Sequence, residues 1–290
     1  MIQNLRLFKY AAIIFLLLFF QSNTSAYETC KTSGGINIKW QNPEVTYRIN
    51  SSGGPLDTIA SIQEGMQTWT DVASSEFIFL YGGTTNRKNH GTNNATNIIT
   101  FGSLPIGTIA ENKFWFSTVS GQLVDSDIRF NNYYLWSTDG IPATYDLQNI
   151  ATHELGHSLC LLDLYDGASS EITMYGYAST GETKKSSLHQ DDIAGITYLY
   201  TCPNLPVRIE GTSYEYNFLQ DAYDDALSND IILIHSIIFT EDLIIDINKS
   251  VIFDGGYNCD HLSPTANPSV INGTVNLIDG AITMENFIIE

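Results

Sequence analysis

Lysine and arginine are scarce in this chain, and so are histidine and cysteine. Its 290 residues include 13 Lys and Arg against 32 Asp and Glu, which gives a formal net charge of −19. Because such a charge repels nucleic-acid phosphates, the composition argues against nucleic-acid binding. With 6 histidines and 4 cysteines, few residues are available to bind a transition metal. A close grouping of histidines is therefore a specific signal.

Long apolar runs are also rare. After residue 26, no segment approaches the length of about 18 apolar residues that a membrane-spanning helix needs. Residues 1–26 combine a basic start, the apolar run Tyr10–Phe20 and small residues ending at Ala26, the pattern of a secretory signal. We expect cleavage after Ala26 and a secreted, extracellular protein without a membrane span; an uncleaved N-terminal anchor is the alternative.

One short motif, His153-Glu154-Leu155-Gly156-His157, indicates a catalytic metal site. On a helix, residues four apart share a face, so His153 and His157 can reach one ion. Catalytic zinc takes three protein ligands and leaves one position for water, whose pKa it lowers to about 7. Glu154 would lie beside that position and act as general base. A third ligand must come from beyond the helix.

Asp163 is the candidate for that third ligand, with a solvent-facing or helix-capping aspartate as the alternative. The run from His153 to Asp163 resembles the metzincin metallopeptidases, whose motif H-E-x-x-H-x-x-G-x-x-H ends in Asp in some members. Cys160 stands where those proteins have glycine, although cysteine adopts a positive φ less readily. Met174 falls where they have a methionine turn beneath the metal; a core methionine is the alternative. The resemblance implies a zinc peptidase.

Three further segments narrow the resemblance to the matrixins. Leu188–Tyr200 is similar to their last helix, Val45–Ile49 to their first strand, and Asp125–Asn131 to the strand before the catalytic helix. The similarity covers residues 36–201 in the expected order. It implies a twisted mixed sheet flanked by helices, with an edge strand near Gly107–Ala110 to which an extended peptide adds.

Hydrophobic periodicity places the elements around the site. We expect helices at Asp57–Asp71, Leu147–Cys160 and Gln190–Tyr200, and strands at Phe77–Tyr81, Asn97–Phe101, Lys113–Ser117 and Asp125–Phe130. The fold class is therefore α+β, with a metzincin-type catalytic domain at residues 27–201.

The pattern changes at Cys202–Pro206, where two prolines interrupt the chain. After a helical stretch at Tyr216–Leu227, short apolar runs recur at Ile231–Ile234, Leu243–Ile247, Ser250–Phe253, Thr274–Ile278 and Ala281–Ile289. This spacing suits the rungs of a β-solenoid and resembles the start of a right-handed β-helix, with a small β-sandwich as the alternative. Residues 202–290 are thus expected to form a small all-β module, which could bind a glycan, a partner or nothing. Gly255–Asp260 and Ile271–Thr274 are expected to be turns.

Two aspartates before the proposed catalytic helix could form a second cation site. Asp125 and Asp127 could supply oxygen ligands to calcium, although strand-end acids of no special role are the more ordinary interpretation. Animal matrixins hold a structural zinc in this region through several histidines. Only His90 is available here, which argues against a second zinc site.

The four cysteines fit a disulfide-permissive compartment, and three connectivities are open. We favour Cys202 with Cys259 because both lie in the C-terminal segment, and we expect Cys160 to be buried and structural. An alternative for Cys30 is that its thiol blocks the metal and keeps the enzyme latent.

The sequence thus predicts a secreted zinc endopeptidase that acts on protein or peptide substrates. Its proposed metal ligands are His153, His157 and Asp163, with Glu154 as general base. The main alternative is a nonenzymatic surface or adhesion protein with a degenerate peptidase domain. The absence of an N-E-x-x-x-D segment argues against a gluzincin, in which a downstream glutamate is the third ligand.

Overall fold

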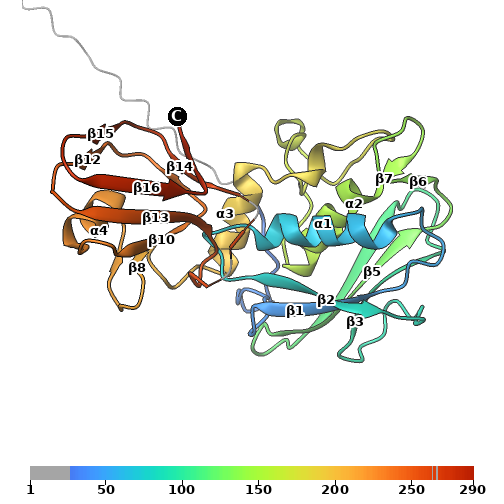
Figure 1. The fold of residues 1–290 in the computed structure, drawn as a ribbon. Helices are drawn as coiled ribbons and strands as arrows, with labels where there is room; N and C mark the ends of the chain where they lie inside the picture. Colours follow the sequence, from blue (N-terminus) through green and yellow to red (C-terminus); the bar gives the residue numbers. More distant parts are fainter. Residues whose placement is uncertain (1–26, 263, 266) are drawn as a thin grey trace, which may run out of the picture.

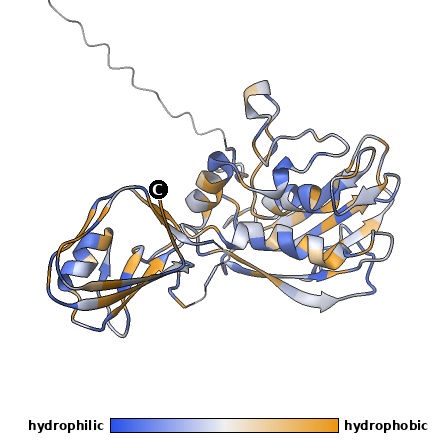
Figure 2. Ribbon diagram, turned by 45° about the horizontal axis from the view of Figure 1, so that its top comes forward, coloured by the Kyte–Doolittle hydropathy of each residue, from blue (hydrophilic) through white to orange (hydrophobic). Residues whose placement is uncertain are grey.

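The computed structural model describes residues 27–262, 264–265 and 267–290. The predicted secretory signal lies outside these residues. Two bodies lie side by side in Figure 1, and each has its own cluster of buried hydrophobic residues. In Figure 2 the apolar stretches follow the strands of both bodies. Among the described helices, none is long and apolar enough to cross a membrane.

A five-stranded sheet forms the base of the N-terminal body, in the order β2-β1-β3-β5-β4. Its strands are β1 (Glu44–Ile49), β2 (Ile78–Thr84), β3 (Asn97–Gly102), β4 (Ala110–Phe116) and β5 (Leu123–Asn131). All neighbours run parallel except β4, which is antiparallel to β5. β4 is therefore an edge strand, and its outer side has no partner strand in the described part of the chain.

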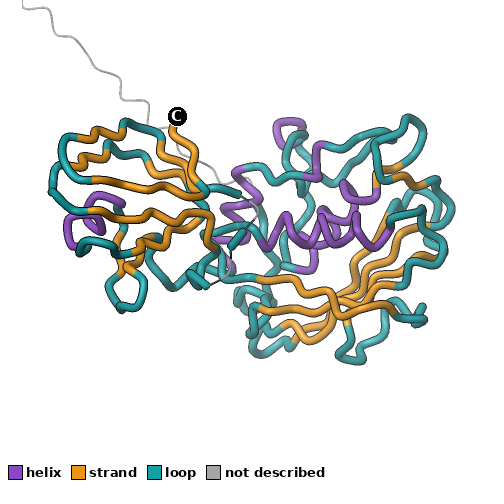
Figure 3. Tube along the Cα trace, in the orientation of Figure 1, coloured by secondary structure: helices purple, strands orange, loops and turns teal. Residues whose placement is uncertain are grey.

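Three helices complete this body, and they lie on one side of the sheet in Figure 3. They are α1 (Thr58–Thr70), α2 (Leu147–Ser158) and α3 (Gln190–Leu199), with short elements β6 (Trp136–Ser137), β7 (Tyr145–Asp146), η1 (Gly167–Ser169) and η2 (Lys184–Ser186). α1 buries Ile62, Met66 and Trp69, the apolar positions that predicted it. The Trp69 indole N–H donates to the Thr152 carbonyl at 2.8 Å, which fixes α1 against α2.

The predicted elements of this body are close to the observed ones. The three helices agree within two residues at each end, and the four predicted strands are present. β4 begins three residues earlier than predicted, at Ala110. Its first residues Ala110–Asn112 alternate poorly between apolar and polar side chains, so the start of the strand was not visible in the pattern.

The C-terminal body is built mainly from short parallel strands. In chain order its elements are β8 (Val207–Ile209), β9 (Glu215–Tyr216), α4 (Leu219–Asp225), β10 (Ile231–His235), β11 (Ile238–Phe239), β12 (Leu243–Ile245), β13 (Ser250–Tyr257), β14 (Ser269–Ile271), β15 (Val275–Leu277), β16 (Ala281–Glu285) and β17 (Phe287–Ile289). Three parallel series run β10-β13-β16, β11-β14-β17 and β12-β15. β8 pairs antiparallel with both β10 and β9.

Two sequence expectations fail in this body. The helix predicted at Tyr216–Leu227 is shorter and spans only α4. Gly255–Asp260 is not a turn throughout, because Gly255 to Tyr257 continue strand β13. A Cβ on Gly255 would lie 2.6 Å from the Ser269 hydroxyl oxygen, so glycine is needed there for close packing rather than for chain reversal.

The strand registers reveal an inserted segment. Ile231 pairs with Ile252, 21 residues later, whereas Ile238 pairs with Val270, 32 residues later. A register shift between Leu233 and His235 adds one residue, since His235 pairs with Tyr257, 22 residues later, and the excursion between β13 and β14 accounts for the other ten. This excursion carries Cys259, which forms a disulfide with Cys202, as the sequence predicted. The excursion thus joins the C-terminal body to the segment that follows α3.

Two histidines stack inside the C-terminal body. His235 and His261 are 2% and 1% exposed, and their ring centroids are 4.0 Å apart. Within the described residues, three of their ring nitrogens have no hydrogen-bond partner: both nitrogens of His261 and the Nε2 of His235. Burial lowers the pKa of both side chains, that of His235 to about 3. Both imidazoles are therefore neutral in the folded protein near pH 7.

This pair predicts acid sensitivity of the fold. Below pH 6.5 the unfolded chain binds protons that the folded state excludes, so the free energy of unfolding falls as the pH drops toward 3. The slope reaches about 1.4 kcal/mol per pH unit for each histidine. Denaturant unfolding measured between pH 7.5 and 4 gives the free energy of unfolding as a function of pH. The slope of this free energy against pH should be smaller for a His235→Phe, His261→Phe double variant than for wild type. Equal slopes would contradict this origin of the acid sensitivity.

Candidate metal centre

Helix α2 presents two imidazoles in a fixed orientation. The Nδ1 atoms of His153 and His157 each lie 2.8 Å from a carbonyl oxygen, of Thr173 and Leu161 respectively. A carbonyl oxygen can only accept, so each Nδ1 carries the proton and donates it. In the neutral imidazole the lone pair is then on Nε2, and this is the form that binds a metal ion.

The chain reverses directly after α2. The Leu161 N–H donates to the Gly156 carbonyl at 3.1 Å and the Cys160 N–H to the His157 carbonyl at 2.9 Å, which is a Schellman motif. Cys160 has a φ of 71°, so it adopts the left-handed conformation that glycine normally supplies. The helix therefore ends where the sequence analysis required, despite the cysteine.

Cys160 is held in this conformation by the N-terminal segment. It is fully buried, as expected, and forms a disulfide with Cys30. The Cys30 N–H donates to the Cys160 carbonyl, and the Leu162 N–H donates to the Glu28 carbonyl, both at 2.9 Å. The alternative in which a free Cys30 thiol blocks the metal is therefore wrong, since its sulfur is bonded to Cys160.

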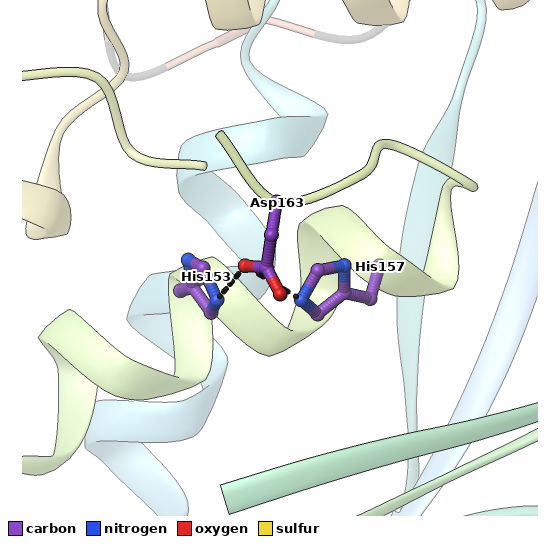
Figure 4. A group of neighbouring side chains, drawn as sticks. All are labelled: His153, His157 and Asp163. Atoms are coloured by element: carbon purple, nitrogen blue, oxygen red, sulfur yellow. Dashed lines mark ion pairs between the residues drawn. The ribbon is translucent and has the colours of Figure 1, made fainter. Parts of the chain in front are cut away.

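Asp163 meets the two imidazoles (Figure 4). Its Oδ1 lies 3.2 Å from the His153 Nε2 and 3.5 Å from the His157 Nε2. The three ligand atoms lie within 4.8 Å of one another, the one group of at least three His, Cys, Asp or Glu side chains found among the described residues. Burial alone would raise the pKa of Asp163, but hydrogen bonds and positive charge from the two imidazoles in their protonated form outweigh burial and lower this pKa well below the usual range.

This donor set fits zinc. Two imidazole nitrogens and one carboxylate oxygen, with further space beside them, are the ligands of a catalytic zinc site. The Asp163 Oδ1 is buried and makes no hydrogen bond within the described chain, so its position suits metal binding better than a structural hydrogen bond. Its other oxygen, Oδ2, accepts a hydrogen bond from the Tyr165 hydroxyl at 3.0 Å.

Glu154 lies beside the group on the same helix. Its side chain is buried, and its Oε2 has no hydrogen-bond partner in the part of the chain described. Burial raises the pKa of Glu154 to about 7. A carboxyl group with such a pKa can both accept a proton and return it near neutral pH.

The segment containing Met174 lies beneath α2. Met174 is buried, and a Cβ on Gly156 would overlap its sulfur. Asp192, in the first turn of α3, accepts the backbone N–H groups of Thr173 at 2.9 Å and Met174 at 3.1 Å. Asp192 thus joins α3 to a segment 18 residues earlier, a tertiary contact for which the sequence offers no local signal.

A cleft of about 400 Å³ opens over the three candidate ligands. One side is formed by Gly107–Asn112 and the other by Gly176–Ala178, with Lys185 also in the lining. The Asn112 side-chain amide donates to the Glu154 carbonyl at 3.2 Å, which ties β4 to α2. The segment Gly107–Ala110 therefore borders the cleft, where the sequence analysis placed the substrate-binding edge.

Asp125 and Asp127 lie away from this group and are fully buried in β5. An Asp125 oxygen accepts the backbone N–H of Ala95 at 2.9 Å, and Asp127 accepts those of Gly91 at 3.0 Å and Ile98 at 3.2 Å. Both carboxylates thus hold the loop before β3. The Asp125 Oδ1 has no hydrogen-bond partner among the described residues, and calcium binding here stays a prediction.

Comparisons with known proteins match the N-terminal body. The Matrixin family model matches residues 39–201. Neutrophil collagenase of Homo sapiens is 27% identical over 186 residues, and matrix metalloproteinase-18 of Xenopus laevis is 30% identical over 179 residues. These matches cover 61% and 60% of this chain but 36% of each relative, about a third of their length. A solved structure, the GM1 bound form of the ECX AB5 holotoxin, aligns with a TM-score of 0.40 and 12% identity, covering 61% of this chain and 89% of that one.

Proposed function

The chain belongs to the matrixin family, and on this premise we propose that it is a secreted, zinc-dependent endopeptidase. The observation that carries the proposal is the convergence of His153, His157 and Asp163 at the floor of a cleft, with Glu154 beside them. The alternative is a nonenzymatic surface protein with a degenerate peptidase domain. Such a protein would not need the carboxylate of Glu154, so the presence of Glu154 disfavours this alternative.

The three ligands would hold zinc, and Glu154 would move the proton. Zinc supplies Lewis acidity, which activates water and polarises the scissile carbonyl. Glu154 accepts the proton of the attacking water and then gives it to the leaving amine. Burial raises the pKa of its carboxyl group, which favours its holding a proton between the two transfers. Met174 supports α2 from below and would serve as the methionine turn.

The substrate is proposed to bind in an extended conformation along β4. The outer edge of β4 is unpaired in the described chain, and it borders the cleft. A peptide added at this edge would pair its backbone with that of β4, so that its scissile bond lies over the metal site. Sequence-independent backbone pairing of this kind suits an endopeptidase.

We propose the domain division 1–26, 27–201 and 202–290, corresponding to the secretory signal, the peptidase and a β-solenoid-like module. Two separate hydrophobic clusters support the division at residue 202. Three series of parallel strand pairs, β10-β13-β16, β11-β14-β17 and β12-β15, support the solenoid interpretation. Two disulfides support an oxidising, extracellular location. The module is proposed to bind a glycan or a partner protein.

The test combines metal analysis with proteolysis of casein by the full-length chain. We expect one zinc per chain, cleavage of casein, loss of cleavage with a zinc chelator, and recovery when zinc is added back. Zinc binding without cleavage by the reconstituted protein would contradict an active peptidase. Absence of bound zinc would contradict the metal site itself.

Tyr165 provides a separate test of the ligand set. Its hydroxyl fixes Asp163 through Oδ2, and losing such an outer contact typically weakens metal binding about 10- to 100-fold. Tyr165→Phe should raise the zinc dissociation constant by about tenfold, measured by competition with a chromogenic chelator. Tyr133→Phe, another exposed tyrosine outside the cleft lining, is the control. Equal affinities of the two variants would contradict the role of Tyr165.

A further inference from the structure

Lys185 is a buried cation in the lining of the cleft. It lies in η2, on the segment that connects Met174 to α3, and it is 1% exposed. Its Nζ donates to the Tyr175 carbonyl, and its backbone N–H donates to the Asn149 side-chain oxygen at 2.7 Å. The side chain is thus held at both ends, and its ammonium group does not extend into bulk solvent.

The charge of Lys185 has no close counter-ion. Within the described residues, no carboxylate oxygen lies within 4.0 Å of its Nζ. The neighbouring Lys184 differs, since it pairs with Glu171 at 3.1 Å. Lysine is almost never fully buried unless it is paired. A buried ammonium group beside an open cleft therefore offers a binding position to an anion.

Each acidic residue in the cleft lining has another partner or another proposed role. Asp163 faces the two imidazoles, and Glu154 is the proposed general base. Glu111 pairs with Lys113 at 2.8 Å. Lys185 is the one lysine or arginine in the lining of this cleft as described. Glu182, three residues before Lys185 in the chain, also acts on this charge but forms no ion pair with it within 4.0 Å. An anion in direct contact with the ammonium group would therefore come from the substrate.

We propose that Lys185 selects peptides with an aspartate or glutamate side chain next to the scissile bond. This inference rests on the proposed function. A substrate carboxylate would form a charge-assisted hydrogen bond with the ammonium group, which is stronger than a neutral one. An apolar side chain at the same position would leave the buried cation unpaired, so selectivity arises both from attraction of one substrate and from rejection of the other.

The test measures kcat/KM for matched peptides that carry Glu, Gln, Leu or Lys on either side of one cleavable bond. Zinc-loaded, full-length wild type should prefer Glu over Gln by about tenfold or more at one of these positions. Lys185→Met keeps a similar side-chain length without the charge and should lose this preference while still cleaving the Gln peptide. Lys185→Arg should retain it, and Lys185→Glu should shift the preference toward Lys.

The outcomes separate this inference from the proposed function. Cleavage by wild type without a preference for Glu would overturn the role of Lys185 and leave the peptidase standing. The same conclusion follows if Lys185→Met keeps the preference. If Lys185→Met fails to fold, the wild-type and Lys185→Arg profiles decide instead. A zinc-loaded wild type that cleaves no peptide would overturn the proposed function and this inference with it.

Discussion

Glu154→Gln is expected to lower kcat/KM for peptide hydrolysis by about 10³-fold while zinc remains bound. Removing a general base typically costs 10²- to 10⁴-fold, and glutamine cannot accept the proton of the attacking water. The Glu154 Oε2 has no hydrogen-bond partner within the described chain, so the amide disturbs no contact of that atom. Loss of activity would then report on chemistry rather than on folding.

The measurement needs activity and metal content from the same preparation. Glu171→Gln is a suitable control, because Glu171 is an exposed acid whose partner is Lys184 and it lies outside the cleft lining. We expect this control to match wild type in both readouts. Full activity of Glu154→Gln would remove Glu154 from the mechanism, whereas loss of zinc would show that the substitution disturbs the metal site.

Asp163→Ala is expected to weaken zinc binding by at least about 100-fold, since even contacts behind a ligand change metal affinity by up to that factor. The remaining imidazoles of His153 and His157 cannot complete the three-ligand set of a catalytic site. Asp163→His should preserve binding, because the related motif commonly has histidine at this position. Asp166→Ala removes a nearby acid that caps η1 and serves as the control. Unchanged zinc affinity in Asp163→Ala would exclude Asp163 as a ligand.

Local features of the site were predictable from the sequence. The spacing of His153 and His157 follows from helical geometry alone, and the apolar positions of α1 are visible in its periodicity. Asp163 required the family resemblance, because the turn that returns it to the helix depends on Cys160. Cysteine at a positive φ becomes understandable only with its disulfide partner, which is 130 residues away in sequence.

Features that depend on long-range contacts were not predictable. Tyr165 and Lys185 have no sequence signal, since their importance comes from what they touch and from how deeply they are buried. Gly255 and Gly256 indicated a turn, yet β13 pairs with β10 on one side and β16 on the other, and these neighbours keep Gly255 within the strand. The Cys202–Cys259 pair was favoured from its location, but the sequence left three connectivities open.

The two disulfides also determine how the chain responds to being cut. Cys30 and Cys160 enclose all five strands of the N-terminal sheet, and Cys202 and Cys259 enclose β8 to β13. A single break between residues 203 and 258 would leave both fragments covalently joined. On electrophoresis such a nicked molecule would run at full mass until a reducing agent separates the pieces. The C-terminal body therefore stays attached to the rest of the chain after a cut in this loop.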